Sequence, residues 1–163
     1  MYPEILSKTN TPVTADKRFG YMLLIDKAPV EEKIMLTTGK HTNRYSIITA
    51  AGIATLPACD LQQQEMFILL CIDPAWNIQY TTQVLLQLRI WNNQLPVIIY
   101  SMEYIDELVR CEDLFYYDAY FLLSDDVGEI QQAIDTALSG KFYVTRNIAR
   151  HYCKHRRTEQ QSL

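Results

Sequence analysis

Met66-Phe-Ile-Leu-Leu-Cys-Ile72 is an unbroken apolar run, and three similar runs occur elsewhere in the chain, at residues 21–26, 96–101 and 119–123. A strand that is buried on both faces needs apolar side chains at consecutive positions, as the central strands of parallel sheets do. The four runs therefore predict buried parallel strands. Residues 45–49, which are rich in β-branched side chains, predict a fifth strand.

Helical patterns separate these strands. Pro29 begins one helix, residues 81–91 carry an apolar stripe at helical spacing, and residues 103–110 predict a short acidic helix. Residues 125–138 predict a further helix, and Gly140 is well placed to end it. Strands that alternate with helices form right-handed βαβ units. We therefore expect an α/β fold with a flavodoxin-like five-stranded parallel sheet in the order 2-1-3-4-5.

The chain continues beyond this sheet. A short aromatic link follows the fifth helix, and the basic run at residues 147–157 predicts an additional C-terminal sixth helix that starts at Thr145. We therefore divide the chain into a flexible polar arm at residues 1–18, the α/β domain at residues 19–140, and the additional helix at residues 141–157.

The composition is that of one globular domain. The chain has 163 residues, of which 48% are apolar and 21% are charged. No apolar run approaches the ~18 residues of a membrane span, and the N-terminus lacks the apolar core of a signal peptide. The four cysteines form no CxxC pair, which favours reduced thiols. We expect a cytoplasmic protein with no membrane partner.

The net charge of −4 is unevenly distributed. Residues 103–135 hold ten acids and one base, whereas residues 141–157 hold six bases and no acid. Complementary blocks of this kind can pair between two copies of a chain, or the basic block can bind phosphates. We expect the two blocks to meet in a homodimer or higher homo-oligomer. An apolar seam of Phe142, Ile148 and Tyr152 is the alternative interface.

Parallel sheets of this type place their functional sites at the carboxyl ends of the strands. Those ends are Asp26, Cys71, Ser101 and Ser124. The segment Phe121-Leu-Leu-Ser124-Asp-Asp126 is similar to the tyrosine-Leu-Leu-Lys-Asp-Asp signature of LuxR/FixJ-type response-regulator receivers. The chain thus resembles a receiver domain. That resemblance implies an acid pair, a phosphoacceptor aspartate, a hydroxyl and a lysine at this edge, around a Mg²⁺ ion.

The same resemblance implies that this receiver has lost its phosphorylation chemistry. Asp26 matches the acid pair, but Lys27 follows it. Cys71 takes the phosphoacceptor position and Ser124 stands where the lysine belongs, while Ser101 is retained. We therefore expect a pseudo-receiver that holds no metal at this edge.

A phosphorylation-responsive receiver is the alternative. If the third strand shifted by two residues, Asp73 would be the phosphoacceptor. We expect instead that Lys27 pairs with Asp26 or Asp73 and takes the place of the metal.

A small enzyme that uses Cys71 as its nucleophile is a further alternative. Burial among apolar residues raises the pKa of a thiol, which opposes nucleophilic attack. No base is expected nearby, because His41 lies on a helix-to-strand link and His151 and His155 belong to the solvated basic face of the terminal helix. We therefore expect no enzymatic activity.

The receiver signature and the additional helix together resemble a narrower group, the LuxR-type biofilm-matrix regulators. This group includes the curli regulator CsgD and the exopolysaccharide regulator VpsT. The resemblance spans residues 20–163, and its most specific part, 121–146, includes Ser139-Gly-Lys-Phe-Tyr143. It implies a pseudo-receiver that dimerises and a C-terminal helix-turn-helix that binds promoter DNA of matrix genes. Residues 158–163 resemble the linker to that domain, so we expect a truncated regulator. A standalone protein-interaction receiver without DNA binding is the alternative.

In VpsT-like members of the group, a W-[F/L/M]-[T/S]-R motif at the start of the sixth helix binds cyclic di-GMP. The resemblance implies a binding site at the matching positions, which are Tyr143, Val144, Thr145 and Arg146. Aromatic and guanidinium groups stack on guanine, and arginine also forks to its O6 and N7 atoms. Under the alternative interpretation, Phe142 and Tyr143 pack against the preceding helix. Thr145 is then an N-cap and Arg146 a solvated base.

Overall fold

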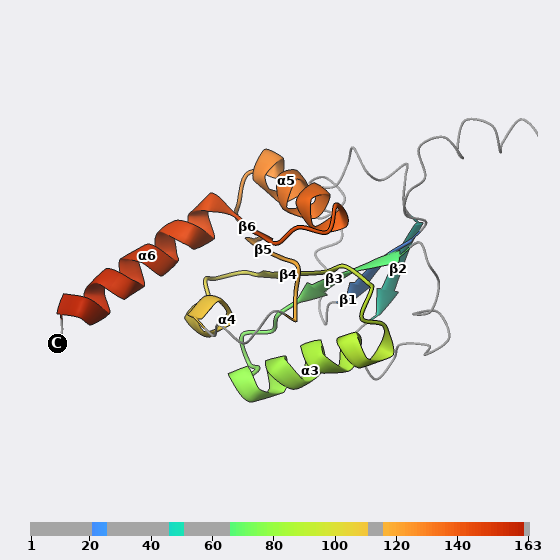
Figure 1. Ribbon diagram of the computed structural model, residues 1–163, viewed down its shortest axis with the longest axis horizontal. Helices are drawn as coiled ribbons and strands as arrows, with labels where there is room; N and C mark the ends of the chain where they lie inside the picture. The colour runs from blue at the N-terminus through green and yellow to red at the C-terminus, as the bar shows by residue number, and fades with distance from the viewer. Residues whose placement is uncertain (1–20, 26–45, 51–65, 111–115, 162–163) are drawn as a thin grey trace, which may run out of the picture.

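The computed structural model describes residues 21–25, 46–50, 66–110 and 116–161 of the chain (Figure 1). The arm expected at residues 1–18 and the helix expected from Pro29 lie outside these ranges. Within the described ranges, the helices are too short or too polar to cross a bilayer.

A parallel sheet of six strands forms the centre of the fold, in the order β2-β1-β3-β4-β5-β6. The strands are β1 (Tyr21–Ile25), β2 (Ser46–Ala50), β3 (Met66–Cys71), β4 (Val97–Ser101), β5 (Ala119–Leu122) and β6 (Tyr143–Val144). Every pair of neighbouring strands is parallel. The predicted flavodoxin-like order of the first five strands is confirmed, and their bounds lie within one residue of the prediction.

The sequence does not predict the sixth strand. β6 pairs with the outer edge of β5, where the Tyr143 N–H donates to the Asp118 carbonyl at 3.0 Å and the Thr145 N–H donates to the Tyr120 carbonyl at 3.2 Å. The expected aromatic link is too short to show a strand pattern. It becomes a strand because its backbone groups need partners and the edge of β5 supplies them.

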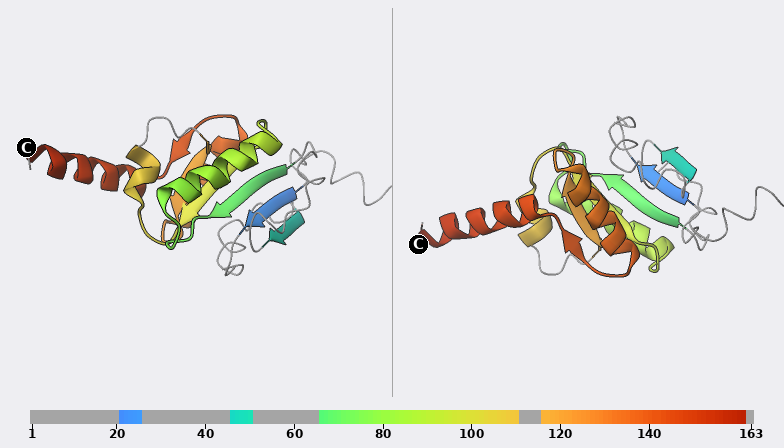
Figure 2. Two further views of the ribbon diagram at one scale, coloured as in Figure 1. Left: turned by 90° about the horizontal axis from the view of Figure 1, so that it is seen from below. Right: turned by 90° about the horizontal axis from the view of Figure 1, so that it is seen from above.

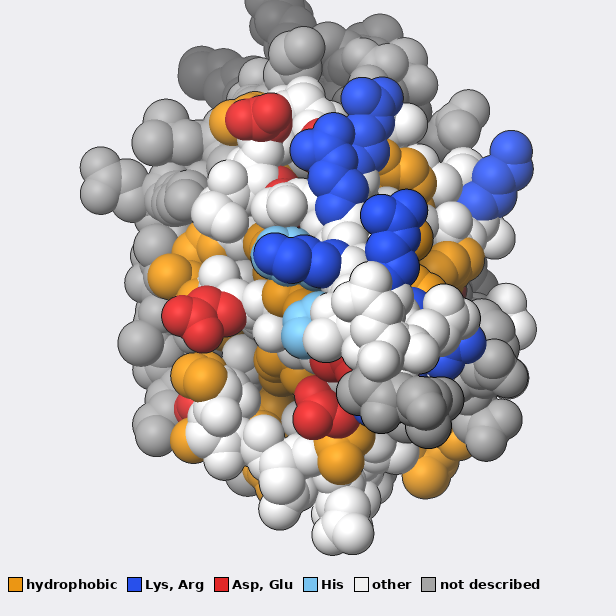
Figure 3. Space-filling model, turned by 90° about the vertical axis from the view of Figure 1, so that its left-hand side faces the viewer, with side chains coloured by type: hydrophobic (Ala, Val, Ile, Leu, Met, Phe, Trp, Pro, Cys, Tyr) orange, Lys and Arg blue, Asp and Glu red, His pale blue; other side chains and the backbone are white. Residues whose placement is uncertain are grey.

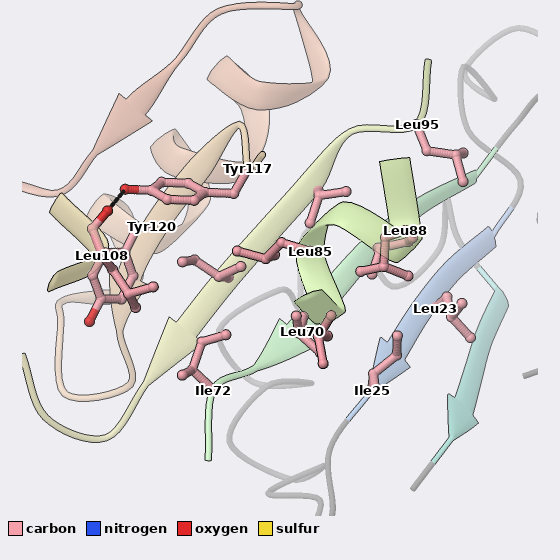
Figure 4. Packing of buried hydrophobic residues seen from close by; sticks show 14 of the residues in the cluster. Leu23, Ile25, Leu70, Ile72, Leu85, Leu88, Leu95, Leu108, Tyr117 and Tyr120 are labelled. Carbon is pink, nitrogen blue, oxygen red and sulfur yellow. Dashed lines mark hydrogen bonds between the residues drawn. The ribbon is translucent and has the colours of Figure 1, made fainter. Parts of the chain in front are cut away.

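Helices cover both faces of the sheet (Figure 2). α3 (Ile78–Trp91) packs on one face, where Leu85 and Leu88 join the buried side chains of the strands (Figure 4). α5 (Val127–Leu138) packs on the other face through Ile130, Ala133, Ile134 and Ala137. Since both faces are covered, consecutive strand residues are buried, which is the physical origin of the apolar runs.

The ends of these helices follow their capping residues. α3 begins three residues earlier than predicted, because the Asn77 side chain accepts a hydrogen bond from the Tyr80 N–H at 2.8 Å. Gly140 follows α5 as predicted. Its φ of +84° is a left-handed conformation that favours glycine, and its N–H donates to the Ala137 carbonyl at 3.0 Å.

Two further helices lie side by side at the end of the domain, α4 (Asp106–Arg110) and α6 (Arg146–Gln161). α4 is shorter than the predicted 103–110, because residues 103–105 belong to the loop after β4. α6 starts one residue after Thr145, close to the prediction, but it continues to Gln161. Residues 158–161, which we expect to begin a linker, are therefore helical.

Aromatic stacking connects α6 to the β4–α4 loop. The Tyr104 ring stacks on the rings of His151 and His155, with centroids 5.1 Å and 5.4 Å apart. Arg110 of α4 also pairs with Glu159 of α6. We call this group the α4–α6 contact. Both histidines are expected on the solvated basic face, but their rings face Tyr104, although His151 is only half-buried and His155 stays exposed.

Ile148 fixes the first turn of α6 to the core. Its side chain is 0% exposed and belongs to the same hydrophobic cluster as Leu85 and Leu108. Among the described residues of α6, Ile148 is the buried one. Ile148 therefore cannot take part in the alternative dimer seam, whereas the part assigned to Phe142 and Tyr152 stays a prediction. The expectation that the two charge blocks meet in a dimer stays a prediction.

Arg89 connects several segments at the amino ends of β4 and β5. The Arg89 guanidinium of α3 donates to the Leu95 carbonyl at 2.8 Å, to the Tyr116 carbonyl at 3.1 Å and to the Asp118 carboxylate at 2.8 Å. The same Asp118 oxygen accepts the Val97 N–H at 2.7 Å. One side chain thus ties α3 to the start of β4 and to the segment before β5.

Candidate functional site

The carboxyl ends of three central strands meet at one edge of the sheet. Cys71 ends β3, Ser101 ends β4, and Ser124 lies two residues beyond the end of β5. These three predicted site residues therefore share an edge, as the sequence indicates. Asp26 and Lys27 lie outside the described residues, so their contribution stays a prediction.

Cys71, which the sequence resemblance assigns to the phosphoacceptor position, is the last residue of β3. It is half-buried and packs against the sheet face that α5 covers. Asp73 lies beyond the strand, where its Oδ1 accepts the Ala75 N–H at 2.8 Å and stabilises a turn. Mg²⁺ prefers oxygen ligands, and a thiol does not fit it. The last residue of β3 is therefore a thiol and not a carboxylate.

The Ser101 hydroxyl is engaged in a buried hydrogen-bond chain. Its side chain is 1% exposed, and its Oγ donates to the Glu103 carbonyl at 2.7 Å. The Tyr120 hydroxyl lies 2.6 Å from Ser101 Oγ and accepts the Ile105 N–H at 3.2 Å. Since the one Ser101 proton points to Glu103, Tyr120 donates to Ser101. Burial raises the pKa of Tyr120, so its hydroxyl keeps the proton it donates.

This hydrogen-bond chain fixes the loop that carries Tyr104. It uses the single Ser101 proton, which a receiver would otherwise offer to a phosphoryl oxygen. Ser124, where the receiver pattern has its lysine, is exposed and carries no positive charge. The described part of this edge is therefore satisfied internally and offers no cation to an incoming phosphoryl group.

The sequence does not single out Tyr120 as a site residue. The receiver signature aligns its tyrosine with Phe121, whose ring instead stacks on Tyr100 at 5.4 Å in the core. The hydroxyl thus sits one position earlier and on the opposite face of β5. One signal was present: a tyrosine in a strand that is otherwise apolar must find a hydrogen-bond partner when it is buried.

A second constellation lies where β5, α5 and α6 meet. Thr145 is 0% exposed, and its Oγ1 donates to Asp125 Oδ2 at 2.6 Å. That same carboxylate oxygen accepts the Leu122 N–H at 2.8 Å. The Thr145 carbonyl accepts the Ala149 N–H at 3.0 Å, so its backbone starts α6 while its hydroxyl turns away from the helix. Thr145 therefore holds the N-cap position of α6, as the alternative interpretation expects, but its hydroxyl bonds Asp125 rather than the backbone of the helix.

Glu129 of α5 contacts the other two polar residues of the predicted cyclic di-GMP motif, Tyr143 and Arg146. Its Oε2 accepts the Tyr143 hydroxyl at 2.8 Å, and its Oε1 lies 3.1 Å from Arg146 Nε. Burial and the hydrogen bond to Glu129 raise the pKa of Tyr143. Tyr143 packs against the α5 side of the core, and Val144 packs against the opposite side. The Arg146 side chain is 79% exposed.

The structure therefore brings all four motif residues to one corner but gives them different roles. Thr145 is closed to any ligand, and Tyr143 is half-buried with its hydroxyl engaged. Only Arg146 extends into solvent, with Nε held by Glu129. A planar guanidinium that is fixed at one nitrogen and open at the others can still stack on a base or form forked hydrogen bonds.

No protein-family model and no curated protein matches this sequence. Solved structures do match it. The chain is similar to a two-component response regulator of the LuxR family from Aurantimonas sp., with a TM-score of 0.62 and 16% identity over 85% of this chain and 98% of that chain.

Two other solved structures give the same picture. The chain is similar to the isolated REC domain of RcsB from Salmonella enterica serovar Typhimurium, with a TM-score of 0.64 and 10% identity over 82% of this chain and 98% of that chain. It is also similar to a LuxR family DNA-binding response regulator from Silicibacter pomeroyi, with a TM-score of 0.62 and 17% identity over 79% of this chain and 99% of that chain. At these identities the likeness establishes the fold alone: the chain has the receiver fold.

Proposed function

We propose that this chain is the regulatory domain of a LuxR-type transcription factor, and that it acts without phosphorylation and without enzymatic activity. The observation that carries the proposal is Cys71 at the end of β3, in the phosphoacceptor position. The buried, hydrogen-bonded Ser101 and the uncharged Ser124 support it. Together they support a receiver fold in which internal contacts take the place of the phosphorylation chemistry.

Phosphorylation independence has a direct test. Incubation with acetyl phosphate and Mg²⁺ is expected to leave the intact mass of the chain unchanged, because a thiol does not take the place of the acceptor carboxylate. A receiver domain that retains its aspartate, treated in parallel, shows that the reagent is active. A mass increase of one phosphoryl group that disappears in Asp73→Asn would instead establish the phosphorylation-responsive alternative.

We assign the domain to a cytoplasmic homodimer that binds promoter DNA of biofilm-matrix genes through a helix-turn-helix domain. The support is the resemblance to LuxR-type matrix regulators, together with the receiver fold and the additional helix α6. The reading frame beyond Leu163 in the source genome decides this part of the proposal. A helix-turn-helix there supports it, and a stop codon favours the standalone interaction module.

Cyclic di-GMP is the ligand that we propose for the corner of β6 and α6. The specific observation in its favour is Arg146, which is exposed and oriented by Glu129. Arginine in this state can contact guanine with little loss of side-chain freedom, because the ion pair already restricts it. Thr145 and Tyr143 then serve to position the start of α6 rather than to contact the ligand.

Calorimetric titration tests the ligand. Wild-type protein is expected to bind cyclic di-GMP, and Arg146→Ala is expected to weaken binding by about 10- to 100-fold, the size of a lost charged hydrogen bond. Arg150→Ala is the matched control, since it removes another exposed cation one turn along α6 and should leave binding unchanged. An absence of heat with the wild type would remove this ligand.

A further inference from the structure

α6 presents two opposite faces. Its inner face contacts the rest of the domain through Ile148, His151, His155 and Glu159. Its outer face carries a cation at every third or fourth position, namely Arg146, Arg150, Lys154 and Arg157. Residues at this spacing share one side of a helix of 3.6 residues per turn, and the two sets lie about half a turn apart. Figure 3 shows Lys and Arg side chains gathered in the upper part of this end of the molecule, with histidine side chains at their border.

Three of the four outer cations lack a balancing charge within the described chain, and the fourth, Arg146, pairs with Glu129. Within the described chain, Arg150, Lys154 and Arg157 contact no acidic side chain, and all three are exposed. With Ala149 and Cys153 they line an open groove of about 470 Å³. Like charges one helical turn apart repel each other, so this face is less stable than a neutral one unless an anion binds to it.

Five acidic side chains of the described residues are engaged within their own chain. Four of them form ion pairs with arginines: Asp106 and Glu159 with Arg110, Asp118 with Arg89, and Glu129 with Arg146. The fifth, Asp125, accepts a hydrogen bond from Thr145. In a second copy of this chain these five carboxylates already have partners, so they are poorly placed to bind the outer face. The imbalance favours an external polyanion as the partner of the outer face.

We infer that Arg150, Lys154 and Arg157 form a contact surface for the phosphate backbone of double-stranded DNA that does not read base sequence. The three residues span about 10.5 Å along the helix axis. A duplex carries one negative charge per ~1.7 Å of its length, so it supplies more phosphates than this face has cations. The inference rests on the proposed function, because a DNA-bound regulator would bring α6 close to the same duplex.

The test is fluorescence anisotropy of a labelled duplex of arbitrary sequence, about two helical turns long, titrated with the chain itself. Three phosphate contacts predict that log K falls against log salt with a slope of about −2.7, so that affinity drops about 40-fold between 50 and 200 mM salt. Duplexes of different sequence should bind equally. Lys154→Glu is expected to reduce affinity on the order of tenfold and to flatten the slope by about 0.9.

Lys141→Glu is the matched control, because it makes the same change of charge at an exposed position outside α6. Unchanged binding in this control and weakened binding in Lys154→Glu support the inference. It is overturned if the wild type fails to bind DNA at 50 mM salt, or if both variants lose affinity equally.

Sedimentation of the same samples separates the remaining outcomes. If Lys154→Glu abolishes self-association while the wild type binds no DNA, the outer face meets a second copy and the DNA surface is wrong. If the wild type binds no DNA but its mass is unchanged by acetyl phosphate, the DNA surface is wrong and the proposed function still stands. The two proposals therefore fail independently.

Discussion

Ile148→Ala is expected to lower the free energy of unfolding by about 2–5 kcal/mol, the range for truncating a fully buried isoleucine. Ile148 is 0% exposed and is the residue through which α6 enters the core. The loss should therefore fall on α6 first. Urea denaturation measures the free energy, and amide hydrogen exchange should show that α6 loses protection before the sheet does.

Val127→Ala is the control for this substitution. Val127 is 46% exposed at the start of α5, so its truncation should change stability by no more than about 0.5 kcal/mol. If Ile148→Ala left stability unchanged and altered only self-association, Ile148 would belong to an intermolecular seam. That result would contradict the packing described above.

Arg89→Met is expected to cost about 2–3 kcal/mol of stability. The guanidinium satisfies the Leu95 and Tyr116 carbonyls and pairs with Asp118, and methionine keeps the aliphatic packing while it removes all three contacts. The side chains of Arg89 and Asp118 are 17% and 31% exposed, so solvent screens part of the charge interaction. For that reason we place the loss below that of a fully buried pair.

Arg110→Met provides the matched comparison in urea denaturation. Arg110 also pairs with acids, Asp106 and Glu159, but its side chain is 48% exposed. Surface pairs of this kind contribute about 0–1 kcal/mol. Equal losses in the two variants would show that the hydrogen bonds of Arg89 to the backbone add nothing beyond a surface ion pair.

The strands and their order followed from the sequence because burial on two faces leaves a direct signal. A strand such as β3 must be apolar at every position, and turn residues such as Gly140 mark where helices end. Helix starts are less visible, because a single hydrogen bond from Asn77 extends α3 beyond its apolar stripe. The apolar pattern of a sequence reflects which side chains are buried, and a capping hydrogen bond does not change that pattern.

Polar contacts between distant segments leave no such pattern. The pairing of Tyr120 with Ser101, of Thr145 with Asp125 and of Tyr104 with the two histidines depends on three-dimensional proximity. The sequence could name Ser101 as a candidate from the receiver resemblance and Thr145 from the resemblance to the biofilm-matrix regulators. It could not show that both hydroxyls are already taken by neighbours within the domain.

β6 has one more consequence, which concerns solubility. Without Tyr143 and Val144, the outer edge of β5 would expose unpaired backbone groups beside four buried side chains. Open, apolar strand edges recruit strands from other chains and lead to aggregation. A strand of only two residues closes that edge and is itself too short to serve as a template. The segment that starts α6 thus also prevents strands of other chains from adding to the edge of β5.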